Sequence, residues 1–208
     1  MELILASKSA RRQEILKNLH VPYRIFTEDV DETLPPDISP RDAVICLARK
    51  KAYACRDAMG GVGEGQLLLS ADTVVALGNC IYGKPRDEED AVRMLTSLSG
   101  TTHSVFTGYC LISGARECAD AEETQVTFRP LREEDIRYYI RTEPPYDKAG
   151  AYGIQELAGL FVGKCGIFDH QWSAKGQAAR IYAAEVVQEE KLTRTGEPYC
   201  WLKGYAYM

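Results

Sequence analysis

The 208-residue sequence predicts an α/β fold built around a mixed β-sheet. Apolar runs with strand character alternate along the chain with amphipathic helical segments, which is typical of α/β proteins. Hairpins interrupt the strand–helix–strand rhythm, so we expect antiparallel as well as parallel strand pairs. A chain of this length corresponds to one domain, or to two lobes that share a core.

The first elements are predicted by an apolar run and the helical pattern that follows it. Residues 2–6 have the pattern of a buried strand. Residues 9–19 are expected to form a helix, because Ile15, Leu16 and Leu19 recur on one face.

The next segment changes from a strand to a long helix. Residues 23–33 are predicted to be a strand that runs out into an acidic loop, and the proline-rich stretch 34–40 disfavours helix. Residues 40–59 are expected to be helical, since Pro40 suits a first turn. The residues expected on its inward side are Ala43, Cys46, Leu47, Lys51 and Ala54.

The middle of the chain contains the strongest strand signal, at residues 67–77, with the carboxylate of Asp72 in its interior. Residues 78–85 are predicted to turn back as a hairpin. A helix is expected at 86–100, because acids occupy its first turn and Gly100 follows its end.

The remaining elements alternate between strand and helix patterns. Segments 103–113 and 123–131 are predicted to be antiparallel strands, and 132–143 a helix. Residues 144–164 are expected to form a loop, a short helix and a strand.

Composition limits the classes of partner. A net charge of −5 argues against general affinity for nucleic acid or anionic membranes. No membrane-spanning run or signal-peptide pattern is apparent, so we expect a cytoplasmic protein. The seven cysteines include no C-x-x-C pair and are expected to be reduced thiols, and a structural zinc site is not expected.

The segment "ASKSARR" is a candidate phosphate site. Ser7 and Ser9 offer hydroxyl donors, and Arg11 and Arg12 offer guanidinium groups that suit phosphate oxygens. The start of the predicted helix would add backbone N–H groups. The alternative is that Ser9 merely caps the helix, and from these residues alone the two readings are about even.

Two carboxylates are candidate catalytic or metal-binding groups. Asp72 interrupts a run that otherwise looks buried, where an unpaired charge would cost several kcal/mol. It therefore calls for a cation, a metal or a position at a functional edge, the alternative being hydrogen bonds to neighbouring backbone. Glu32 lies in an acidic loop that could equally be only solvated. Together the two acids could hold Mg²⁺, which uses few protein carboxylates.

Further polar residues come from separate segments. Lys51 and Lys84 add cations, although single lysines are common on surfaces. Lys148 and Gln155 lie among small residues, which suits either close approach of a ligand or a tight structural turn. His103 lacks a serine or cysteine partner in any hydrolase motif and is expected to be structural, or to contact a residue of the site without touching substrate.

With these residues in view, the sequence resembles the Maf nucleoside triphosphate pyrophosphatases. The matching stretches include "LILASKSARRQEIL", "SADTVVAL", "GKPRDEEDAVRMLTSLSGTTHSVFTG" and "DKAGAYGIQ", in family order over about residues 2–164. The resemblance implies a two-lobed α/β fold related to inosine triphosphatases, with an elongated, twisted mixed sheet, flanking helices and a central cleft. It also implies hydrolysis of a nucleoside triphosphate to the monophosphate and pyrophosphate with a divalent cation, Mg²⁺ or alternatively Mn²⁺.

The resemblance also implies roles for individual residues. Asp72 corresponds to the catalytic proton acceptor and Glu32 to the metal-associated glutamate. With Asp72, Glu32 makes up the expected pair of metal-binding acids. The implied phosphate-binding residues are Ser7, Ser9, Arg11, Arg12, Lys51 and Lys84. Lys148 is added as a candidate phosphate-binding residue because of its place among small residues. The positions tied to substrate choice are Arg11, Thr73 and Gln155.

The expected branch is the one acting on dTTP and UTP. The alternatives are a preference for CTP or modified pyrimidine nucleotides, or a nucleotide-binding regulator of septum formation and cell division. Nucleic acid and membranes are not expected as partners, and a homodimer is left open.

The chain departs from the family pattern in three places. Lys50 replaces a common acid, and Glu156 replaces the glycine usual after "GIQ", which puts an anion beside the substrate loop. After a pyrophosphatase domain at 1–164, residues 165–208 do not match the expected closing strand and helix. A shifted reading frame and true divergence are about even explanations for this segment.

Overall fold

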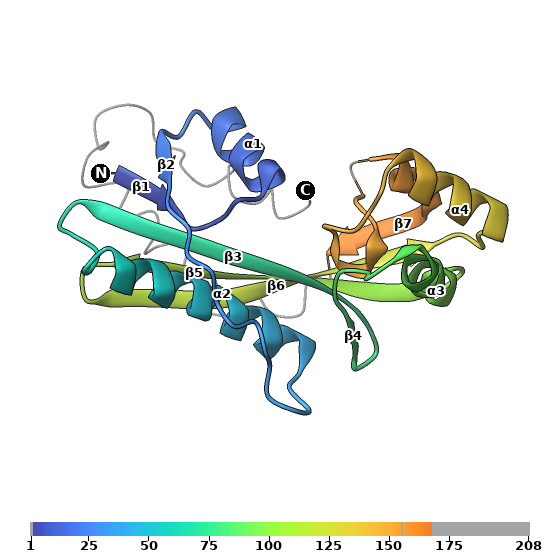
Figure 1. Ribbon diagram of the computed structural model, residues 1–208, viewed down its shortest axis with the longest axis horizontal. Coiled ribbons are helices and arrows are strands. Elements are labelled where there is room, and N and C mark those ends of the chain that lie inside the picture. Colours follow the sequence, from blue (N-terminus) through green and yellow to red (C-terminus); the bar gives the residue numbers. More distant parts are fainter. Residues whose placement is uncertain (1, 155, 168–208) are drawn as a thin grey trace.

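The computed structural model describes residues 2–154 and 156–167 and shows an α/β protein with helices on both faces of one seven-stranded mixed sheet (Figure 1). The C-terminal segment predicted at 165–208 begins within the last strand of the sheet, and residues 168–208 lie outside the described part of the chain. No helix among the described residues is long and apolar enough to cross a membrane.

The helices are α1 (Ala10–Asn18), α2 (Pro40–Ala58), α3 (Glu88–Leu98), α4 (Glu133–Thr142) and the 3₁₀ turns η1 (Ala149–Ala151) and η2 (Leu157–Phe161). The strands are β1 (Glu2–Leu5), β2 (Tyr23–Ile25), β3 (Gln66–Leu77), β4 (Cys80–Tyr82), β5 (Thr102–Ser113), β6 (Arg116–Phe128) and β7 (Val162–Ile167).

The sheet has the order β2-β1-β3-β5-β6-β7, with β4 paired to β3. β1 is parallel to β2 and β3, and the other pairs are antiparallel. This confirms the mixed sheet that the interrupted strand–helix rhythm predicted.

Two lobes lie along the long strands β3, β5 and β6 (Figure 1). At one end, α1 and α2 cover opposite faces of the sheet, each over its own apolar cluster. At the other end, α3, α4, η1 and η2 enclose a larger cluster of aromatic and aliphatic side chains. The predicted two-lobed architecture is therefore present in the described part of the chain.

Helix α2 packs very closely on the sheet. Ser39 caps its start by accepting a hydrogen bond from the Asp42 N–H, and Pro40 occupies the first turn as expected. A methyl group added at Gly108 of β5 would lie 2.5 Å from the Val44 carbonyl carbon, so only glycine fits there. The buried side of α2 is rotated from the predicted one: Cys46 and Ala54 are half-buried. Its buried residues after the first turn are Ala43, Val44, Leu47, Ala48, Ala52 and Cys55.

One stretch of β3 has a strand neighbour on only one side. β1 pairs with β3 as far as Leu69, and β4 pairs with β3 from Val75 onward. Between them, residues 70–74 pair with β5 alone among the described strands. This open stretch of strand edge lies between the lobes, and it carries Asp72 and Thr73.

Candidate functional site

The parallel strand ends bring the candidate residues together. The loop after β1 carries Ser7 and leads into α1, and the segment after the adjacent β2 carries Glu32. β3 runs parallel to β1 and continues past its end to Asp72. Ligands of open α/β sheets commonly bind beyond the carboxyl ends of such strands.

Arg12 is the centre of the site on the α1 face of the sheet. Its Nη1 donates to Ser7 Oγ at 3.1 Å, and its Nη2 donates to Thr73 Oγ1 at 3.2 Å. The Thr73 hydroxyl lies 3.2 Å from Thr107 Oγ1 of β5, its direct partner in the register. Two hydroxyls thus hold the guanidinium group, and a third, from β5, contacts one of them.

No carboxylate among the described residues forms a salt bridge with Arg12. Burial lowers its pKa, the charge of Asp72 opposes this effect, and the nearby charge of Arg11 adds to it. A partly buried cation whose hydrogen bonds go only to neutral hydroxyls is costly unless an anion binds beside it. The α1 face is therefore suited to an anionic ligand.

The α2 face carries the acidic half of the site, because successive residues of a strand point to opposite faces. Lys51 of α2 donates a hydrogen bond to Asp72 Oδ1 and lies 2.8 Å from Glu32 Oε1. Burial alone would lower the pKa of Lys51, but the two carboxylates raise it. The hydrogen bond from Lys51 lowers the pKa of Glu32, with a smaller contribution from the charge of Lys84. Lys51 and Glu32 are therefore charged at neutral pH.

Glu32 and Asp72 converge on one ammonium group, and this arrangement fits a divalent cation. No cluster of three His, Cys, Asp or Glu side chains with metal-binding geometry occurs in the described part of the chain. A cation held here would take two protein carboxylates and complete its coordination with water and phosphate oxygens, as Mg²⁺ commonly does.

The other predicted residues of the Ser7–Arg12 segment lie around Arg12. Ser9 occupies the N-cap position of α1, but its side chain makes no capping hydrogen bond; its N–H donates to Ser7 Oγ at 3.2 Å. Capping therefore does not account for the Ser9 hydroxyl. Arg11 is half-buried and makes no hydrogen bond or ion pair with another described residue.

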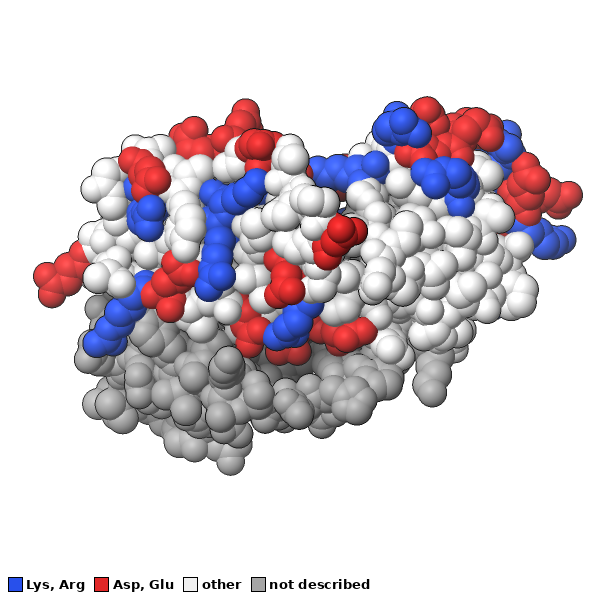
Figure 2. Space-filling model, turned by 90° about the horizontal axis from the view of Figure 1, so that it is seen from below, with Lys and Arg blue, Asp and Glu red and all other residues white. Residues whose placement is uncertain are grey.

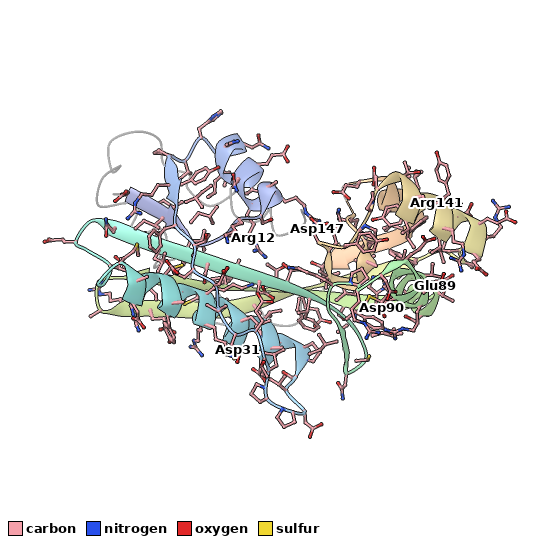
Figure 3. The ribbon with its side chains drawn as sticks, in the orientation of Figure 1. Arg12, Asp31, Glu89, Asp90, Arg141 and Asp147 are labelled. Carbon is pink, nitrogen blue, oxygen red and sulfur yellow. The ribbon has the colours of Figure 1, made fainter. Side chains whose placement is uncertain are left out.

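Residues of the second lobe approach the same place. Lys84, just after β4, is exposed. Lys148 is buried, and its Nζ is 3.0 Å from Asp147 Oδ1 and 3.2 Å from Glu156 Oε2. Figure 3 shows Asp147, in the loop before η1, on the side of the second lobe that lies toward α1, and the charge of Arg11 helps to lower the pKa of Asp147. Gln155 lies outside the described residues.

His103 belongs to the core of the second lobe rather than to the site. Its Nε2 is 2.7 Å from the Tyr152 hydroxyl, and its ring packs edge-on against Phe128. Burial lowers the pKa of His103 to about 4. The structural role predicted from the sequence is confirmed.

Thr107 is the residue that sequence reasoning missed. The segment "VFTG" carries no signal of chemistry, and only its register opposite Thr73 reveals the contact with the Arg12 network.

Charge on the surface is mixed. Figure 2 shows acidic and basic side chains interspersed on the face seen from below, with no broad area of one sign among the described residues.

Comparison with known proteins gives this geometry a family context. The family model for Maf-like proteins matches residues 2–167. A dTTP/UTP pyrophosphatase of Phocaeicola vulgatus is 41% identical over 87% of this chain and 93% of its own length. One of Bacillus cytotoxicus is 44% identical over 77% and 82%, and one of an Anaeromyxobacter strain is 38% identical over 96% and 92%. The chain belongs to the Maf-like protein family.

Proposed function

We propose that this protein hydrolyses dTTP and UTP to the nucleoside monophosphate and pyrophosphate. The relatives are named for this activity, and the site offers a cationic face next to a carboxylate pair. The observation that supports it best is Arg12, a partly buried cation held by Ser7 and Thr73 with no acidic partner among the described residues.

The triphosphate would bind along the open edge of β3. Arg11 and Arg12, the hydroxyls of Ser7 and Ser9, and the N-terminus of α1 would contact its oxygens. Lys84 would approach from the second lobe. These groups would offset the charge that develops on pyrophosphate as it leaves.

Asp72 would act as the general base. A water oxygen attacks the α-phosphorus, the bond from that phosphorus to the bridging oxygen breaks, and the water proton passes to the Asp72 carboxylate. Lys51 orients this carboxylate through its hydrogen bond. A divalent cation, Mg²⁺ or Mn²⁺, held by Glu32 and Asp72 would neutralise phosphate charge.

Selectivity for the base is proposed to involve Arg11, Thr73 and Gln155. The Thr73 hydroxyl already contacts Arg12 and Thr107, so its contribution would include orienting Arg12. We propose that the reaction takes place in the cytoplasm, and the free thiols at the described cysteines support this.

The test is to identify products and rank substrates. Purified protein with Mg²⁺ is offered dTTP, UTP, CTP and the purine triphosphates, and products are separated by ion-exchange chromatography. We expect monophosphate and pyrophosphate, fastest from dTTP and UTP, with ¹⁸O from labelled water in the monophosphate. Release of orthophosphate and a diphosphate, or nucleotide binding without turnover, would contradict the proposal.

A further inference from the structure

The loop from Asp147 to Glu156 packs directly beside the proposed site. Gly150 of η1 lies against Val75, where an added methyl would be 2.8 Å from the Val75 Cβ. The Gly150 N–H also donates to the Gly83 carbonyl at 3.0 Å, next to Lys84. Val75 is two residues beyond Thr73 and therefore on the same face of β3. This loop forms the second-lobe wall facing α1.

Lys148 is held between two carboxylates in this wall. Its side chain is only 10% exposed, whereas that of Asp147 is 75% exposed and that of Glu156 is 34% exposed. Glu156 Oε2 itself is buried and makes no hydrogen bond with a described residue, although it lies 3.2 Å from Lys148 Nζ. Glu156 therefore acts on Lys148 by charge rather than through a well-aligned hydrogen bond.

Gly153 allows this arrangement. An added methyl at this position would meet Glu156 Oε2 at 2.9 Å and Lys148 Cε at 3.2 Å. The backbone of the loop thus passes directly over the ion pair, and the carboxylate is packed in place.

The charges of this wall sum to −1, from two acids and one base, on the side facing Arg11. Burial alone would raise the pKa of Asp147, but the hydrogen bond from Lys148 and the charges of Lys148 and Arg11 lower it. A triphosphate with about four negative charges would enter beside a wall whose only buried cation is already neutralised, and exposed charges still act over about 8 Å at physiological salt.

We propose that Glu156 is a positioning residue that restrains Lys148 and weakens its attraction for the polyphosphate, so that it sets the KM for the triphosphate. This rests on the proposed function, because it concerns the same site. Removing the Glu156 charge leaves Lys148 with Asp147 as its one acidic partner among the described residues, so Lys148 attracts phosphate oxygens more strongly and highly charged ligands bind more tightly.

The experiment is a double-mutant cycle of Glu156→Gln and Lys148→Gln. We expect Glu156→Gln to lower the KM for UTP about two- to fivefold, the range for one partly exposed ion pair. In the Lys148→Gln background the same substitution should change KM much less, because the partner through which it acts is absent. Glu64→Gln, which removes the same charge from an exposed loop, is the matched control and should leave KM unchanged.

A second readout does not depend on hydrolysis. Calorimetric titration with inorganic tripolyphosphate should show the same tightening in Glu156→Gln, diminishing at high salt. Glu156→Ala repeats the test if the glutamine variant fails to fold. An unchanged KM and affinity, or an equal effect in the Lys148→Gln background, would overturn the inference. A wild-type protein that binds tripolyphosphate but hydrolyses no nucleotide would instead refute the proposed function.

Discussion

The described residues that accept hydrogen bonds from Arg12 carry no charge. Its hydrogen bonds reach Ser7 in the loop after β1 and Thr73 in β3, and Thr73 in turn contacts Thr107 in β5. A guanidinium group held in this way is oriented before substrate arrives, which reduces the entropy lost on binding.

We expect Thr107→Val to impair triphosphate binding without unfolding the protein. The substitution removes the hydroxyl that contacts Thr73, so Arg12 loses part of its support, at a cost of about 1 kcal/mol or roughly fivefold in kcat/KM. Steady-state kinetics with UTP measures this effect, and Thr107→Ser should restore activity.

The matched control for this prediction is Thr102→Val on the same strand. Thr102 Oγ1 contacts Thr127 Oγ1 at 2.8 Å, far along β5 from the site, so its loss should leave kcat/KM near wild type. Equal losses in the two valine variants would show that Thr107 has only a structural effect.

Single residues of the site were predictable where their chemistry conflicts with their surroundings. Asp72 stands out as a charge within an apolar strand, and Arg11 and Arg12 stand out where only a cap is needed. Thr107 could not be found in this way, because its partner is 34 residues away and is chosen by strand register.

Helix α2 places Lys51 against Asp72. The distance between α2 and the sheet decides whether the two side chains can form their hydrogen bond. Val44 contacts the sheet at Gly108, which is the register partner of Asp72. Lys51 lies two helical turns farther on, on the same side of α2. The close approach at Gly108 therefore supports the Lys51–Asp72 contact.

We expect Gly108→Ala to destabilise the protein and reduce activity together. The added methyl would lie 2.6 Å from the Val44 carbonyl oxygen, so α2 must move away at a cost of about 1–3 kcal/mol. Urea unfolding followed by circular dichroism measures the loss. Gly163→Ala, where the added methyl meets neighbours at ordinary distances of 3.7 Å and more, should change stability little. Equal stability of the two variants would refute the close-packing argument.

The elements themselves were largely predictable, but their rotation was not. Periodicity located α2 within a residue or two of its observed ends. It did not show that Val44 and Ala48 would face the sheet in place of Cys46 and Ala54, because all four are small or apolar and only packing against Gly108 and β3 distinguishes them.

At the scale of the whole molecule, the long strands hold the two lobes together. The proposed site lies at residues 70–74 of β3, where the strand has no described neighbour on the side away from β5. Each lobe has its own apolar cluster, so a ligand that contacts both lobes at the site need not disturb the packing of either cluster. Alternating apolar and polar residues predicted the strands. The stretch of β3 that neither β1 nor β4 covers depends on the lengths and pairing of those strands, which periodicity does not predict.

Buried His103 makes stability depend on pH. Its pKa is about 4 in the folded protein against an ordinary value of 6.5, so the native state resists protonation. The neutral His103 ring makes its full contribution to the free energy of unfolding above pH 6.5. As the pH falls from 6.5 toward 4, the free energy of unfolding decreases by on the order of 3 kcal/mol. Urea midpoints across this window should decline for wild type and decline less for His103→Gln, which cannot titrate. Parallel curves would contradict this assignment.

The most direct measurement is pyrophosphate release from UTP and dTTP by Asp72→Asn, compared with Asp120→Asn. Asp120 lies on β6, two strands from β3, and accepts a hydrogen bond from Arg41 of α2, so it serves as a matched control outside the proposed site. Circular dichroism should show both variants folded, since Lys51 keeps its contact with Glu32. We predict that Asp72→Asn loses about 10²–10⁴-fold in kcat, as expected for a missing general base, while Asp120→Asn stays near wild type. Turnover by Asp72→Asn within a few-fold of wild type would contradict the central claim.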